Sequence, residues 1–176
     1  MVKEKKDFGW PAALRDYSWS SIVEDSIIPL IFSIILLVIM LWLKIDLYKA
    51  LSSIVNLSLQ IVPIMLSLLL AGYAILLTLY ATNFMKEIKN MGGTYLFTQI
   101  NASFAIAIFV MVIGVFVNVT SSFIISLNIK SPSYINEDVI NGSLFIIIMF
   151  LLVFSIRIIK DVTVNIYNLG KALLKM

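Results

Sequence analysis

Cysteine and histidine are both absent from the 176 residues of this chain. Without cysteine there is no disulfide and no thiolate nucleophile. Without either residue the usual Cys/His zinc sites are excluded, as is the imidazole that most often switches charge near neutral pH. These absences remove much of enzyme chemistry. We therefore expect a protein that is not an enzyme and uses no metal or other cofactor.

Charged residues are also scarce. Only 13% of the residues are charged, 61% are hydrophobic and the mean hydropathy is +1.03. Soluble domains are about 25% charged and roughly half apolar. A globule of this size cannot bury so much apolar surface within itself, so the composition predicts an integral membrane protein whose solvent is lipid.

The apolar residues fall into four blocks, at 27–43, 57–81, 100–127 and 139–159. A helix that crosses the hydrocarbon core needs about 20 apolar residues, and each block reaches or approaches that length. The alternation of a membrane β-barrel is missing. We predict an all-α integral membrane protein with four transmembrane helices. The first block is expected to be a retained helix rather than a cleaved signal peptide, because acidic Glu24 and Asp25 precede it and no small-residue cleavage motif follows Leu43.

The basic residues predict the orientation. Ten of the 13 belong to the N-terminal segment, the middle loop and the C-terminal end: Lys3, Lys5, Lys6, Arg15, Lys86, Lys89, Arg157, Lys160, Lys171 and Lys175. Only Lys44, Lys49 and Lys130 lie on the other side. Because cytoplasmic loops are enriched in Lys and Arg, both termini are expected in the cytoplasm.

Three regions follow from this division. Residues 1–26 form an N-terminal segment, in which Leu14, Tyr17, Trp19 and Ile22 alternate with polar residues and predict a short amphipathic helix on the cytoplasmic face. Residues 27–160 form the transmembrane domain. Residues 161–176 form a cytoplasmic tail that continues a helical pattern.

The third span carries a stripe of small and polar residues at helical spacing: Ser103, Ala107, Val110, Gly114, Asn118 and Ser121. One interpretation is close helix packing, in which small side chains let backbones approach. The other is a pore face, with Asn118, Thr120, Ser121 and Ser122 forming polar rings in an oligomer. The pore interpretation predicts that Asn118→Leu lowers conductance. The second span contains Pro63 and Gly72, which indicate a bend and a packing notch or, alternatively, a gating hinge.

Four basic residues, Lys86, Lys89, Arg157 and Lys160, flank the predicted spans on the cytoplasmic side. They fit the positive-inside rule, and they also fit a ring that binds an anionic ligand such as a phosphate. No ionisable residue lies in the middle of a span, which disfavours an ion-coupled transporter.

Residues 67–84, SLLLAGYAILLTLYATNF, followed by Lys86-Glu87-Ile88-Lys89, resemble small four-helix membrane proteins of bacterial anti-phage systems. The chain is similar to the channel effector of Hailong-type systems and, to a lesser degree, to the membrane subunit of Kiwa-type systems. The resemblance implies a homo-oligomer, with a tetramer favoured, in the bacterial inner membrane. A Hailong-type protein would be closed by an oligonucleotide from a partner nucleotidyltransferase. A Kiwa-type protein would work with a cytoplasmic DNA-binding partner.

The leading hypothesis is thus an oligomeric ion channel that acts as a defence effector. Two alternatives remain: a non-conducting anchor or sensor that recruits a cytoplasmic partner, and a holin-like or immunity protein.

Overall fold

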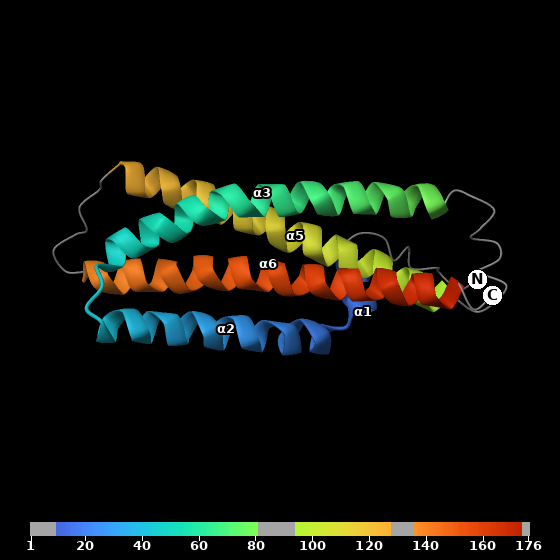
Figure 1. Ribbon diagram of the computed structural model, residues 1–176, viewed down its shortest axis with the longest axis horizontal. Coiled ribbons are helices and arrows are strands. Elements are labelled where there is room, and N and C mark those ends of the chain that lie inside the picture. The colour runs from blue at the N-terminus through green and yellow to red at the C-terminus, as the bar shows by residue number, and fades with distance from the viewer. Residues whose placement is uncertain (1–9, 81–93, 128–135, 174–176) are drawn as a thin grey trace, which may run out of the picture.

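The chain folds into a bundle of long helices. A computed structural model describes residues 10–80, 94–127 and 136–173, and over these ranges it contains helices and no strand. In chain order the helices are α1 (Trp10–Tyr17), α2 (Trp19–Trp42), α3 (Leu47–Tyr80), α5 (Thr94–Ser126) and α6 (Glu137–Leu173) (Figure 1).

Among the described residues, four helices are long and apolar enough to cross a membrane. The candidate spans are Ser20–Trp42, Leu47–Thr78, Phe97–Ser126 and Glu137–Asn168, with hydropathies between 2.3 and 2.6. The predicted fold class is confirmed, and the chain is a multi-pass membrane protein. The helices extend beyond the predicted apolar blocks at several ends, because helix geometry continues into polar residues once the backbone leaves the lipid.

The first span begins earlier than its apolar block because the backbone breaks at Ser18, whose φ is 70°. This left-handed conformation is uncommon for a residue with a Cβ and ends α1 at Tyr17. The predicted amphipathic helix is therefore the eight residues of α1, whereas Trp19 and Ile22 belong to α2. Tyr17 is buried and Arg15 is exposed, so α1 presents one face to the bundle.

The connection from α2 to α3 is a tight turn. Lys44 takes a left-handed φ of 53°, and Ile45 N donates to Met40 O at 3.0 Å, which closes the end of α2. The Asp46 carboxylate then accepts hydrogen bonds from the backbone N–H groups of Tyr48 and Lys49 at 3.0 and 3.2 Å. Asp46 is the N-cap of α3, and this is why α3 begins at Leu47, well before the predicted block at 57.

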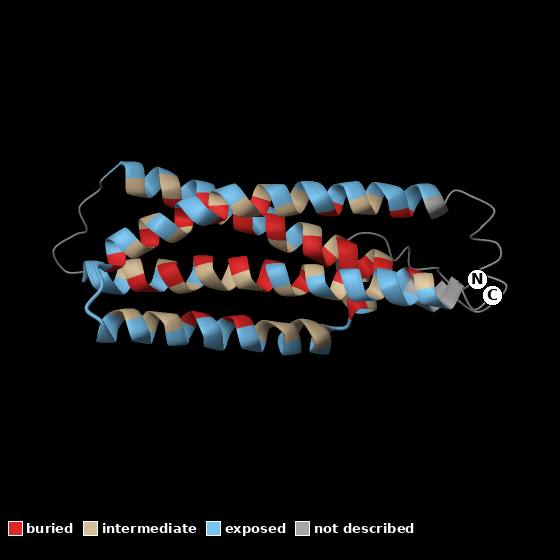
Figure 2. Ribbon diagram, viewed as in Figure 1, coloured by how far each residue is buried: buried red, intermediate tan, exposed pale blue. Residues whose placement is uncertain are grey.

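Helix α6 is the centre of the bundle and packs against α2, α3 and α5, while α3 also packs on α5. Figure 1 shows α2 and α3 on opposite sides of α6. Buried residues line the facing sides of the helices (Figure 2), and the largest include Phe104 and Met111 of α5 and Ile148 and Ile158 of α6. The α1 end of the bundle also holds the last turns of α6, and the Trp42 end holds the α2–α3 turn and the start of α6.

Candidate functional site

The stripe predicted on the third span faces the interior of its own chain. Five of its members are buried: Ser103, Ala107, Gly114, Asn118 and Ser121. A Cβ on Gly114 would lie 3.8 Å from a methyl group of Val62 on α3, and Ser103 Oγ accepts a hydrogen bond from Asn165 of α6 at 3.0 Å. The arrangement is that of close helix packing. Of the other two predicted pore residues, Thr120 is exposed and Ser122 is half-buried; a pore lined by this stripe stays a prediction, and α3 and α6 occupy its face here.

Two polar atoms inside the α3–α5 interface lack a hydrogen-bond partner. Asn118 Nδ2 donates to Gly114 O at 2.7 Å, but Asn118 Oδ1 is buried and unpaired. Ser58 Oγ is also buried and unpaired. The helices are antiparallel and Gly114 lies beside Val62. Ser58 precedes Val62 by four residues and Asn118 follows Gly114 by four, so the two groups stand at the same level of the interface.

The outward face of α3 carries a row of polar and small residues, which is interrupted by Ile64, a residue that is 63% exposed. The exposed polar and small residues at helical spacing are Ser53, Asn56, Gln60, Ser67, Ala71, Ala74 and Thr78, and exposed apolar residues such as Leu68 and Ile75 flank them. Successive members are separated by three, four or seven residues, which keeps them on one side of a helix. They lie opposite the buried residues Leu51, Val55, Ser58, Val62, Leu69 and Leu76. We call this row the α3 polar face.

The hydroxyl groups and the amides of the α3 polar face differ in their hydrogen bonding. Ser67 Oγ donates to Pro63 O at 2.9 Å, and Thr78 Oγ1 donates to Ile75 O at 2.7 Å. The side-chain amides of Asn56 and Gln60 have no hydrogen-bond partner among the described residues. An amide in hydrocarbon seeks a partner on a neighbouring helix, so the two amides require a covering that a single chain does not supply.

The other spans show ordinary lipid-facing surfaces. On α2 every exposed residue from Ile27 to Trp42 is apolar. On α5 the exposed side is dominated by large apolar residues such as Phe116, which is 73% exposed. Sequence reasoning concentrated on the third span and missed the α3 polar face. Asn56, Gln60 and Ser67 have helical spacing in the sequence, but this spacing identifies an outward face only once the buried side of α3 is known.

Pro63 and Gly72, the predicted hinge residues, both lie within α3. Proline cannot donate to the carbonyl four residues earlier, which weakens the helix at that point, and α3 bends along its course in Figure 1. A Cβ on Gly72 would lie 3.4 Å from Phe104 Cε1 of α5, so Gly72 lets the ring of Phe104 approach. The bend and the packing notch are both present, while a gating function for them stays a prediction.

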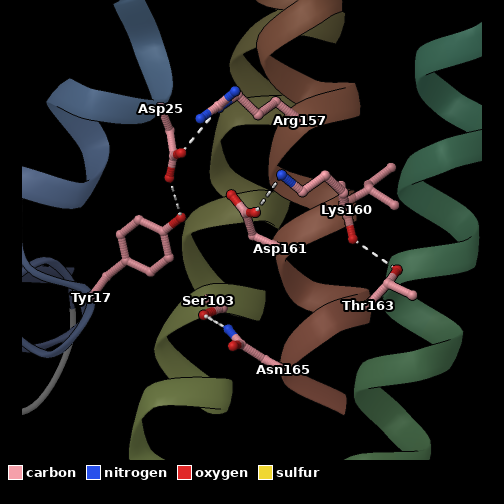
Figure 3. A network of polar contacts seen from close by, with 9 residues as sticks. Tyr17, Asp25, Ser103, Arg157, Lys160, Asp161, Thr163 and Asn165 are labelled. Carbon is pink, nitrogen blue, oxygen red and sulfur yellow. Dashed lines mark hydrogen bonds and ion pairs between the residues drawn. The ribbon is translucent and has the colours of Figure 1, made fainter. Parts of the chain in front are cut away.

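A polar network joins three helices at the α1 end (Figure 3). Tyr17 Oη donates to Asp25 Oδ2 at 3.1 Å, and Arg157 Nε donates to Asp25 Oδ1 at 3.0 Å. Burial, and then the negative charge of Asp25 that accepts the hydrogen bond, raise the pKa of Tyr17 well above its ordinary value. Asp25 therefore holds a neutral phenol and a cation together, and links α1 and α2 to α6.

The two described basic residues of the predicted ligand ring are both matched by carboxylates. Arg157 pairs with Asp25, and Lys160 Nζ lies 3.6 Å from Asp161 Oδ1. A cleft of about 230 Å³ beside them is lined by Tyr17, Ser21, Glu24, Asp25, Gln99, Ser103, Asp161, Val164 and Asn165. Its charged lining is acidic, which is unfavourable for a phosphate ligand. Lys86 and Lys89 lie outside the described residues.

No group of acidic residues in the described ranges is arranged to hold a metal ion. Comparison with known proteins adds no family: no family model, curated protein or solved structure matches the chain. The function is therefore inferred from the geometry of the bundle.

Proposed function

We propose that the protein is a homo-oligomeric ion channel in which the α3 polar face of each copy lines a water-filled pore. The observation that carries the proposal is the row of polar and small residues on the outward side of a membrane-spanning helix, with the unpaired amides of Asn56 and Gln60 within it.

The free energy of these amides in lipid is the physical reason. Moving an amide from water to an apolar medium without a hydrogen bond costs several kcal/mol, about 4–8 on the most stringent scale. Water in a pore satisfies Gln60 without any specific partner. The small side chains of Ala71 and Ala74, both exposed, would allow α3 helices of neighbouring copies to approach closely around an axis.

The remaining surfaces support the same orientation of each copy. The exposed apolar sides of α2 and α5 suit contact with lipid, whereas the amides of Asn56 and Gln60 on the α3 polar face are costly there. A ring of copies that turns α3 inward and α2 outward places each surface in its favoured solvent. Polar rings of amide and hydroxyl groups would then contact permeating ions.

The biological setting of the proposal comes from the sequence. The distribution of basic residues predicts that both termini are cytoplasmic, and the resemblance of residues 67–84 suggests a defence effector in the bacterial inner membrane. An oligonucleotide regulator would gain little from Arg157, which is paired with Asp25 at 3.0 Å, whereas Lys160 is 65% exposed and its contact with Asp161 is long, at 3.6 Å.

Ion flux from dye-loaded liposomes containing the purified protein tests the proposal. Wild-type protein is expected to conduct, and Gln60→Leu is expected to reduce the flux at least several-fold because it removes a polar ring from the pore. Phe116→Leu on the exposed side of α5 is the matched control and should conduct like the wild type. Equal flux from Gln60→Leu and the wild type would show that α3 does not line the pore.

The chief alternative is a non-conducting anchor or sensor, in which the α3 polar faces of two copies pair without water. It predicts an oligomer that Gln60→Leu weakens and no flux under any condition. Native mass spectrometry of the same samples measures the oligomer, so the two functions give different pairs of results.

A further inference from the structure

A groove opens at the Trp42 end of the bundle, where α2 and α3 lie on either side of α6. Its volume is about 500 Å³, and its walls are mainly apolar. The lining residues come from all three helices and from the α2–α3 turn: Leu36, Met40, Ile45, Lys49, Ala50, Ser53, Ile54, Leu57, Phe145 and Met149. The groove is separate from the α1-end network.

The polarity of the groove changes with depth. Lys49 and Ser53, its polar residues, belong to the first two turns of α3, next to the turn that contains Lys44 and Asp46. Ser53 is also the first member of the α3 polar face, so it lies on the border between the two surfaces. Leu57 on α3 and Met149 on α6 line the deeper part. With a rise of 1.5 Å per residue, Lys49 and Leu57 are about 12 Å apart along α3. One end of the groove is therefore cationic and interfacial, and the other is purely apolar.

We propose that this groove binds a phospholipid, with an acyl chain along the apolar walls and an anionic phosphate at Lys49. At that depth the surrounding hydrocarbon consists of lipid acyl chains, so an acyl chain can pack against the apolar walls of the groove. Lys49 is 82% exposed, and its contact with Asp46 is long, at 3.7 Å. The backbone N–H groups of α3 use Asp46 Oδ1, and Lys49 contacts only Oδ2; a long contact between exposed groups contributes little, so the ammonium group remains available to a phosphate.

Small residues create the space that the lipid would fill. Ala50 is half-buried in the wall of the groove, and a larger side chain there would project into the cavity. Ala50→Phe therefore blocks the groove without altering a charge. Lys49→Gln removes the charge and leaves the cavity, so the two variants separate the acyl contribution from the headgroup contribution.

Native mass spectrometry of protein released from nanodiscs tests the proposal, using equal amounts of phosphatidylglycerol and phosphatidylcholine. The wild type is expected to retain about one lipid per chain and to prefer phosphatidylglycerol several-fold. Ala50→Phe should lose the retained lipid, and Lys49→Gln should lose the preference but keep a lipid. Lys171→Gln, an exposed cation at the other end of the bundle, is the charge-matched control and should behave as the wild type.

Equal lipid retention by the wild type and Ala50→Phe would overturn the lipid site. If Ala50→Phe also lost its oligomer, that result would assign the groove to a second copy of the chain. Thermal melting of each variant in detergent separates a blocked groove from a misfolded protein.

Discussion

Asp25 of α2 and Arg157 of α6 lie 132 residues apart in the sequence and form an ion pair of 3.0 Å at the α1 end of the bundle. Their side chains are 15% and 25% exposed, respectively. The other oxygen of the same carboxylate, Asp25 Oδ2, accepts a hydrogen bond from the hydroxyl group of Tyr17. Three helices therefore meet at one charged group, at the point where the apolar part of α2 begins.

Removal of either member of this pair should destabilise the bundle. Single truncation of a fully buried ion pair costs about 3–5 kcal/mol, and an exposed pair contributes about 0–1 kcal/mol. With intermediate exposure, Asp25→Asn or Arg157→Gln should lower the free energy of unfolding by about 1–3 kcal/mol. Denaturant titration in detergent measures this value, and Lys49→Gln is the control with an exposed pair. If the loss of unfolding free energy in the double variant equals the sum of the losses in the two single variants, the two side chains are not coupled.

Tyr17 should make stability depend on alkaline pH. Because its pKa is raised in the folded protein, it contributes stability that is present below its ordinary pKa of 10.0 and is lost as the pH rises above that value. At about pH 8 Tyr17→Phe should be less stable than the wild type by about 1 kcal/mol, since a hydrogen bond is lost. The difference should shrink or reverse at about pH 11, where the unfolded wild type ionises. A gap that stays constant between these pH values would contradict the account.

Two glycines of α6 should respond differently to the same substitution. A Cβ on Gly142 would lie 3.5 Å from Leu37 of α2, whereas nothing lies within 4 Å of the corresponding position on Gly170. Gly142→Leu should separate α2 from α6 and cost about 1–3 kcal/mol, as overpacking does. Gly170→Leu should be neutral or stabilising by up to about 1 kcal/mol, because leucine favours the helix. Thermal unfolding in detergent compares them, and equal effects would mean that α2 does not pack at Gly142.

Ser58 and Asn118 should be energetically coupled across the α3–α5 interface. Ser58 Oγ and Asn118 Oδ1 are both unpaired and stand at the same level of the interface, so a direct or water-mediated hydrogen bond would satisfy both. The coupling from a double-mutant cycle of Ser58→Ala and Asn118→Leu should be about 0.5–1.5 kcal/mol, within the range measured for hydrogen bonds between membrane helices. If the effects of the two substitutions on the free energy of unfolding are additive, Ser58 and Asn118 do not interact. Since Asn118 faces the interior of the chain, we now expect Asn118→Leu to change stability rather than conductance, in contrast to the prediction from sequence.

The sequence was sufficient for the helices but not for their rotation. Runs of apolar residues specify which segments enter lipid, so the four spans followed from composition and length. In lipid, however, a buried face and a lipid-facing face are both apolar, and helical spacing alone does not tell which side of a helix meets its neighbours. The stripe through Gly114 and Asn118 was therefore compatible with packing and with a pore. The α3 polar face was distinguished only when Leu51, Val55 and Val62 were found on the opposite side.

The network around Asp25 was beyond the sequence for a different reason. Arg157 and Lys160 follow the positive-inside rule whether or not they have partners, and nothing in the spacing of Tyr17 and Asp25 indicates that Arg157 lies beside them. Contacts over such separations depend on how the helices are arranged in space. The start of α3, by contrast, was within reach, because Asp46 is a favoured N-cap residue.

The absence of cysteine makes substituted-cysteine accessibility the most direct test of the central claim, that α3 lines a pore. Single cysteines at Gln60, Ser67, Asn118 and Val38 are reacted in liposomes with a water-soluble thiol reagent while ion flux is recorded. We predict that the reagent modifies cysteines at Gln60 and Ser67 and blocks the flux, and that it does not reach Asn118 inside the bundle or Val38 on the lipid-facing side of α2. If the cysteine at Asn118 reacts and blocks the flux while those at Gln60 and Ser67 do not react, the claim is wrong and α5 lines the pore.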